Sequence, residues 1–300
     1  MLSLPTSIPG VVRIQYLATP QTTRTTPSLL IETAHGATRR SHYTQLARKL
    51  KSPLPDNLID FFHVNTDVGA PELGIATALA LLEQDPTQLI ALFTSEIPRT
   101  LIDVNRVLDI DPAAYREGKV TPGLPPYITS PEDISLLTGL HSQYHHALDQ
   151  LVEATCRSGG LALMLHTYAP RSVDVQVDSD IVKQLHWAYQ DEARWPLRPE
   201  IDVICRTVDG DLKIPEERLQ DIQARYKALG ILVADGKTYP LHPSTQAARH
   251  AQRWPGKCYC IEFRRDLLCS PWAPFEEQEI GMHKAELLAG PLAAFLAAHA

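Results

Sequence analysis

Short apolar runs alternate with longer amphipathic segments along most of the chain. Each run is bounded by glycine, proline or polar residues, which is typical of buried strands. The runs cover residues 28–33, 89–93, 161–168, 201–208 and 258–263, and a looser alternation over residues 11–17 predicts an early strand at a sheet edge. The segments between them carry helix start and stop signals. They cover residues 39–51, 71–84, 131–157, 181–189, 215–229 and 246–252. This alternation predicts an α/β fold, with a mostly parallel mixed sheet flanked by helices.

Residues 1–300 are predicted to form one domain, in which two segments differ from the strand and helix pattern. Residues 107–130 are rich in proline, aspartate and glycine, and they predict a loop excursion with the character of a lid. Residues 275–298 are rich in alanine and leucine and predict a C-terminal helix that covers the sheet. Residues 231–234, followed by Asp235-Gly236, predict a short hairpin.

Composition and charge limit the classes of function. Hydrophobic residues make up 44% of the chain, so a sizeable core is expected. Lys and Arg number 28 against 35 Asp and Glu, and the net charge of −7 argues against a nucleic-acid-binding protein while leaving room for a locally basic pocket. We expect a cytoplasmic protein without membrane spans, because no apolar run is long enough and the N-terminus lacks signal-peptide features. The five cysteines form no CxxC pair and predict buried thiols without disulfides.

Polar residues with catalytic potential stand at the ends of several apolar runs. His166 follows the run 161–165, His35 follows the run 28–33, and Glu262 stands near the end of the run 258–263. Asp67 follows a fourth apolar run, residues 61–64. Ligands of open α/β sheets bind beyond the carboxyl ends of the strands, so these four side chains are candidates for one site. Each also has an ordinary structural explanation: a loop or capping role for the histidines, and a helix cap for Asp67.

Two histidines and one carboxylate are the ligand set of a catalytic zinc ion that keeps one position for water. A further carboxylate that does not bind the metal can then act as the general base. Another apolar segment, residues 99–106, carries Arg99, Asp103, Asn105 and Arg106, which is an unusual density of polar groups for a plain strand.

Three more histidines lie on the predicted helix 131–157. Without a nearby carboxylate or cysteine they are interpreted as solvated surface. They are His141, His145 and His146.

The chain resembles the N-formylglutamate amidohydrolase family, which is related to the zinc carboxypeptidases. The resemblance rests on stretches that keep the family's order over about residues 28–268. They are His35-Gly36; Asp67-Val68-Gly69-Ala70 with Leu73 (D-x-G-A-x-x-L); Arg99 to Arg106 (R-x-x-I-D-x-N-R); His166-Thr167-Tyr168 (H-S-[FY]); and Glu262 to Leu267 (E-[IV]-R-x-D-L). The chain departs from the family at Thr167, where the family has serine, and at residues 239–244, where a glycine-rich substrate loop is expected. Both departures bear on acyl-group specificity more than on the metal site.

The resemblance implies a zinc-carboxypeptidase-like fold and one zinc ion per chain. The ion is held by His35, Asp67 and His166, with Glu72 as the alternative to Asp67. Glu262 is implied as the general base, and Arg99 as the group that polarises the scissile carbonyl. The residues implied to contact the substrate are Asn105, Arg106, Tyr168 and Arg264. An arginine suits a substrate carboxylate because its planar fork binds two oxygens at once. The alternative for Arg99 and Arg106 is a structural ion pair with Asp103 or Asp266.

These features predict a zinc-dependent amidohydrolase whose partner is a small acidic N-acyl amino acid. N-formyl-L-glutamate, cleaved to formate and L-glutamate as in histidine degradation, is the leading substrate that the resemblance implies. One alternative is a carboxypeptidase or deacylase that acts on another acyl amino acid. The other is a binding protein that keeps the metal cage without turnover; an intact Glu262 argues against it, because such a cage needs no free base.

Overall fold

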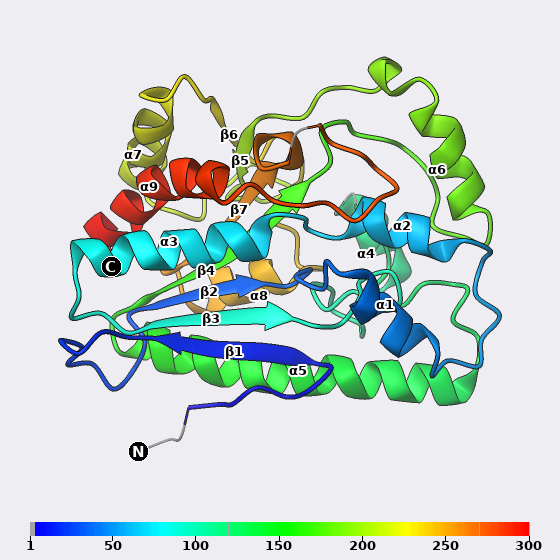
Figure 1. Cartoon of the computed structure of the whole chain (residues 1–300), viewed down its shortest axis with the longest axis horizontal. Coiled ribbons are helices and arrows are strands. Elements are labelled where there is room, and N and C mark those ends of the chain that lie inside the picture. Colours follow the sequence, from blue (N-terminus) through cyan, green and yellow to red (C-terminus); the bar gives the residue numbers. More distant parts are fainter. Residues whose placement is uncertain (1–3, 119, 270, 300) are drawn as a thin grey trace.

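Seven strands form one mixed sheet in the computed structural model, which describes residues 4–118, 120–269 and 271–299 (Figure 1). The strands are β1 Val12–Leu17, β2 Leu29–Thr33, β3 Ile90–Ser95, β4 Leu161–Tyr168, β5 Ile201–Val203, β6 Val233–Asp235 and β7 Cys258–Arg264. Their order across the sheet is β1-β3-β2-β4-β7-β5-β6. The four central strands are parallel, β1 pairs antiparallel with β3 at one edge, and β5 pairs antiparallel with β7. The predicted α/β fold with a mostly parallel mixed sheet is confirmed.

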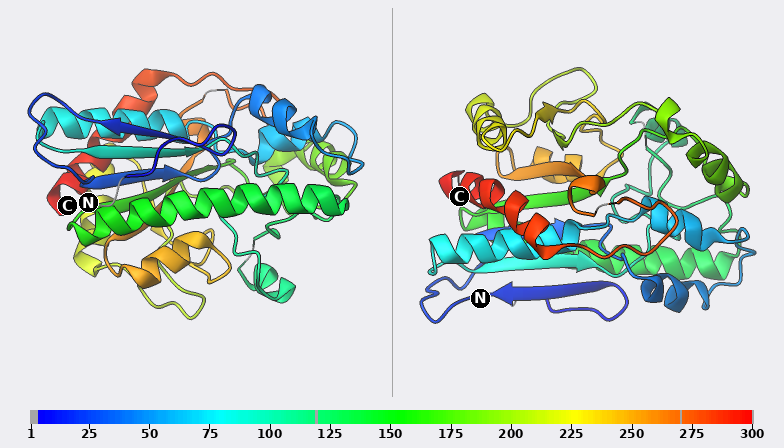
Figure 2. Two further views of the ribbon diagram at one scale, coloured as in Figure 1. Left: turned by 90° about the horizontal axis from the view of Figure 1, so that it is seen from below. Right: turned by 45° about the horizontal axis from the view of Figure 1, so that its top comes forward.

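Helices cover both faces of this sheet. On one face α3 (Ala70–Gln84) packs against α9 (Met282–His299), and α5 (Pro131–Arg157) runs along the other face (Figures 1 and 2). Alternate strand residues supply the two cores: Ile31 and Leu163 pack in the core beneath α3 and α9, whereas Leu30 and Met164 pack in the core beneath α5. The alternation follows from the two-residue period of a strand, and strands buried on both faces must be apolar throughout.

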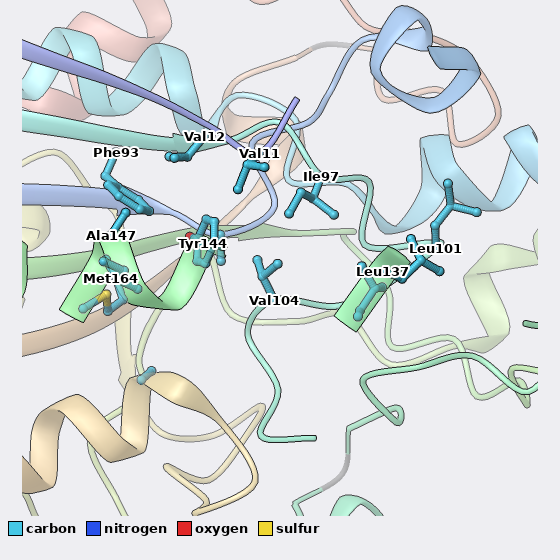
Figure 3. Close-up of a cluster of buried hydrophobic side chains, with 14 of the residues drawn as sticks. Val11, Val12, Phe93, Ile97, Leu101, Val104, Leu137, Tyr144, Ala147 and Met164 are labelled. Carbon is cyan, nitrogen blue, oxygen red and sulfur yellow. The ribbon is translucent and has the colours of Figure 1, made fainter. Parts of the chain in front are cut away.

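Tyr144 of α5 lies in the core between the sheet and α5 (Figure 3). It is fully buried, and its ring meets Phe93 of β3 edge-on at 5.1 Å between the ring centroids. Its hydroxyl donates a hydrogen bond to Glu32 of β2, so a polar pair is satisfied inside an apolar layer. The long helix is thereby tied to the strand that leads into His35.

The remaining helices lie in the connections between strands. They are α1 Arg40–Ala47, α2 Leu58–Asn65, α4 Pro112–Glu117, α6 Ile181–Tyr189, α7 Glu216–Lys227 and α8 Gln246–Arg253. The excursion at 107–130 thus contains α4, although residue 119 lies outside the described part, and the C-terminal helix begins at Met282, seven residues after the predicted start at 275. All five cysteines are buried and free, as predicted. No helix in the described ranges has both the length and the apolarity needed to cross a membrane.

Two local predictions are wrong. The apolar run at residues 61–64 belongs to the helix α2 and not to a strand, so Asp67 follows a helix. Residues 231–236 form no hairpin: β6 pairs parallel with β5, and α7 is the crossover that a parallel pair requires. A short apolar run does not by itself distinguish a buried helix from a buried strand.

Candidate metal centre

The register of two parallel strands brings His166 and Glu262 together. His166 of β4 is paired with Glu262 of β7, so both side chains leave the same face of the sheet. His35 follows the neighbouring strand β2 by two residues, beyond its carboxyl end. Gly36 comes next, and a Cβ atom there would lie 2.5 Å from the Thr94 side chain, so the turn that places His35 needs a glycine.

Asp67 reaches the same point from the turn between α2 and α3. Its backbone N–H donates to the His35 carbonyl oxygen at 3.1 Å, which ties this turn to the end of β2. Gly69, with a φ of +88°, then leads into α3. The Asp67 carboxylate faces the histidine rings and makes no cap bond to this helix, so the cap explanation for Asp67 does not apply.

The three predicted ligands converge on one oxygen. Asp67 Oδ2 lies 3.2 Å from His35 Nδ1 and 3.0 Å from His166 Nδ1, and the three ligand atoms lie within 4.8 Å of one another. Ligand atoms about 2.1 Å from a tetrahedral zinc ion are about 3.4 Å apart, so small side-chain movements would admit the ion. All three side chains are buried. The donor set therefore fits zinc, with Asp67 in the cluster and Glu72 beside Arg39 instead, at 3.7 Å.

Burial and charge control the protonation of these groups. Burial by itself would raise the pKa of Asp67, but His35 and His166 lower it below its ordinary value. Burial lowers the pKa of His166, whereas its bond to Asp67 and its charged neighbours raise that pKa well above the usual range. A metal ion binds the neutral imidazole, so a divalent ion at this centre would take the place of the proton that Asp67 favours on His166.

Asp103 holds His35 from behind. Its Oδ1 lies 2.7 Å from His35 Nε2, which leaves Nδ1 to face Asp67. Its Oδ2 lies 3.0 Å from the Arg99 guanidinium and 3.3 Å from that of Arg106. These arginines and His35 hold the pKa of Asp103 well below its usual range despite burial. A carboxylate behind a ligating histidine fixes the orientation of the ring.

Glu262 is the free carboxylate of the centre. Its Oε2 is buried and has no hydrogen-bond partner among the described residues. Burial raises the pKa of Glu262, which favours a carboxyl group that takes up a proton readily. Leaving a buried oxygen beside His166 without a hydrogen-bond partner costs free energy unless a ligand supplies the contact.

A cavity of about 230 Å³ opens over these groups. Its lining includes the three predicted ligands, the predicted catalytic residues Glu262 and Arg99, and three of the four predicted substrate residues, which are Asn105, Arg106 and Tyr168. The Tyr168 hydroxyl donates to the Pro199 carbonyl oxygen at 2.6 Å, so this group already has a partner within the protein. Arg264 is outside the lining, because it pairs with Asp266 and donates to the Arg198 carbonyl oxygen.

Two solved structures share this fold. One is N-formylglutamate amidohydrolase from Ralstonia eutropha JMP134, with a TM-score of 0.57 and 16% identity over 97% of this chain and 100% of that one. The other is a gene product of Agrobacterium tumefaciens, with a TM-score of 0.54 and 17% identity over 96% of this chain and 94% of that one. No family model and no curated protein matches this chain. The resemblance found in the motifs is confirmed as a resemblance of fold.

The resemblance did not point to Arg265, which follows Arg264 and lines the cavity in its place. Its guanidinium lies 3.5 Å from Asp67 Oδ1 and donates to the carbonyl oxygens of Val64 and Thr167. The chain turns into a short 3-10 helix at Arg265, so the alternation of strand β7 no longer tells which of the two arginines faces the site.

His141 and His145 were predicted on the surface, and this prediction is wrong. Both are buried, with His141 Nε2 donating to the Arg106 carbonyl oxygen at 2.9 Å and His145 Nε2 donating to that of Val104 at 2.7 Å. Burial lowers the pKa of each, which keeps the rings neutral at pH 7. They support the loop that carries Asp103 and Arg106, whereas His146 is exposed as predicted.

Proposed function

We propose that this protein is a zinc-dependent amidohydrolase that cleaves N-acyl amino acids. The observation that carries the proposal is the buried His35–Asp67–His166 cluster with the unpaired carboxylate of Glu262 beside it. The likeness of fold to an N-formylglutamate amidohydrolase supports it. N-formyl-L-glutamate is the first compound to test, and L-glutamate and formate are the expected products.

We assign a role to each residue of the site from the position of its side chain. His35, Asp67 and His166 would hold the ion, and Asp103 would keep the His35 ring in position. A bound zinc ion polarises a carbonyl group and lowers the pKa of a water molecule to about 7. Glu262 accepts the proton of the attacking water at its Oε2 and passes it to the leaving nitrogen.

The arginines supply positive charge on the cavity wall. Arg99 lines the cavity with its side chain 20% exposed, and it is positioned to stabilise the oxyanion that forms at the scissile carbon. Arg106 uses three of its five N–H groups on Thr121, Asn105 and Asp103. The other two have no partner among the described residues and would bind a substrate carboxylate. Asp103 pairs with both arginines, so the structural ion pair and the substrate role are compatible.

The experiment is hydrolysis by the zinc-loaded full chain, followed as release of the free amino acid from a panel of N-acyl amino acids. The expected result is release that stops when a chelator removes the metal and returns when zinc is added. A protein that binds these compounds but releases no amino acid would be a metal-cage binding protein instead.

A further inference from the structure

One wall of the cavity is apolar and is built from three segments. Val173, Val175 and Val177 come from the extended stretch that follows β4, Ile181 and Leu185 come from α6, and Phe61 comes from α2. These side chains carry no polar atom. Asp174 and Gln176, which alternate with the valines, are exposed, so the valines face inward with the two-residue period of an extended chain.

This wall is held in place before any substrate binds. α2 packs against α6 (Figure 1), and a hydrogen bond of 2.8 Å from His186 Nε2 to the Asp60 carboxylate links the two helices. The His186 ring stacks on Phe275 at 4.1 Å. The backbone N–H of Gln176 donates to the side chain of Gln184, which fixes the valine stretch against α6. A preformed apolar surface binds an apolar group without an ordering cost.

Arg106 lies on the loop after β3, whereas the wall is built from α2, α6 and the stretch after β4. Arg106 contacts Asp103, Asp103 contacts Arg99, and Arg99 donates to the Asn65 carbonyl oxygen, which is next to the wall on α2. If the amino-acid carboxylate binds at Arg106, the acyl group on the other side of the scissile amide is directed toward the valines.

The acyl group of the substrate decides whether this apolar wall is covered. A formyl group has no carbon beyond the carbonyl and would leave the apolar wall in contact with water. An aliphatic or aromatic acyl group would cover it.

We propose that the substrates of this site are N-acyl amino acids whose acyl group is a medium-length aliphatic chain or an aromatic ring. The proposal rests on the proposed function and specifies its acyl group. Each methylene group that moves from water to the wall contributes about fourfold in binding. Four methylene groups separate a hexanoyl from an acetyl group, so a preference of at least tenfold is a modest expectation.

The test compares kcat/KM of the zinc-loaded protein for N-hexanoyl-L-glutamate, N-acetyl-L-glutamate and N-formyl-L-glutamate. The hexanoyl compound is expected to exceed the acetyl compound at least tenfold. Val175→Phe places a ring in the space beside the wall and should lower the hexanoyl-to-acetyl ratio of kcat/KM at least tenfold. Asp174→Phe is the control, because it adds the same ring on the exposed side and should leave this ratio within twofold. A ratio near one in the parent protein, or an equal effect of both substitutions, overturns the proposal.

The acyl preference and the proposed function fail in different ways. Cleavage of the formyl compound with no gain for the hexanoyl compound overturns the preference and leaves the amidohydrolase intact. If no compound is cleaved, the proposed function fails, and calorimetry on the parent protein decides the preference without any variant. Binding of N-hexanoyl-L-glutamate at least tenfold tighter than N-acetyl-L-glutamate supports the apolar wall, and equal Kd values overturn it.

Discussion

Replacing Glu262 by glutamine tests the base directly. The substitution keeps the shape of the side chain and removes only its ability to take up a proton. Because Oε2 has no hydrogen-bond partner among the described residues, the change breaks no contact of that oxygen. It also removes a buried carboxyl group whose ionisation burial opposes, so the fold should be at least as stable as in the parent.

The loss in rate should be large and specific. General-base catalysis contributes about 10²–10⁴-fold, which corresponds to a barrier higher by about 3–5 kcal/mol. We therefore expect Glu262→Gln to be folded and zinc-replete, to bind the acyl amino acid, and to release the free amino acid at least a hundredfold more slowly than the parent. Rates come from amino-acid release at saturating substrate, and zinc content comes from elemental analysis of the same sample.

Glu72→Gln is the matched control. Glu72 pairs with Arg39 outside the cavity lining, so its replacement should change neither the zinc content nor the rate by more than a few-fold. Two results would refute the reasoning. Hydrolysis by Glu262→Gln within a few-fold of the parent would remove the base role, and loss of zinc from it would make Glu262 a ligand.

Three further predictions address the ligands, the substrate carboxylate and the buried histidines. The parent should carry about one zinc ion per chain and His166→Ala should lose most of it, since the ligand set would be incomplete; full occupancy in His166→Ala would exclude it as a ligand. Arg106→Lys should lower kcat/KM for an acyl glutamate at least tenfold with little change in zinc content, because lysine has no planar fork; an unchanged kcat/KM would make Arg106 purely structural. Burial, with Arg249 and Arg253 nearby, lowers the pKa of His250 from 6.5 to about 3. Between these two pH values the unfolded chain binds a proton that the folded chain does not, so the stability of the fold decreases as the pH drops from 6.5 towards 3. In urea titrations between pH 4 and pH 6, the free energy of unfolding should fall with decreasing pH less steeply for His250→Asn than for the parent, by about 1.4 kcal/mol per pH unit. Identical slopes for the two proteins would contradict this account.

Much of the centre could be predicted from sequence because most of it lies at the ends of buried strands. The runs before His35 and His166 and around Glu262 are apolar throughout, and polar residues at their ends are conspicuous. The neighbouring register of His166 and Glu262 was not visible, since strand order is a property of the whole sheet. Only the motif indicates Asp67 as a ligand, because the element before it is the helix α2 and not a strand.

The errors have a common physical origin. His141 and His145 are on a helix whose polar residues appear suited to solvent, but the loop at residues 103–106 covers them and offers its carbonyl oxygens. The parallel pairing of β6 likewise depends on where α7 directs the chain. In each case a tertiary contact decides the role of a residue, and local pattern carries no information about that contact.

The central claim is that one metal ion sits among His35, Asp67 and His166. Diffraction data collected from zinc-loaded crystals on both sides of the zinc absorption edge test it most directly. The account predicts one anomalous peak within about 2.0–2.2 Å of His35 Nδ1, His166 Nδ1 and an Asp67 carboxylate oxygen. An empty map at this point, or a peak held by other residues, would contradict it.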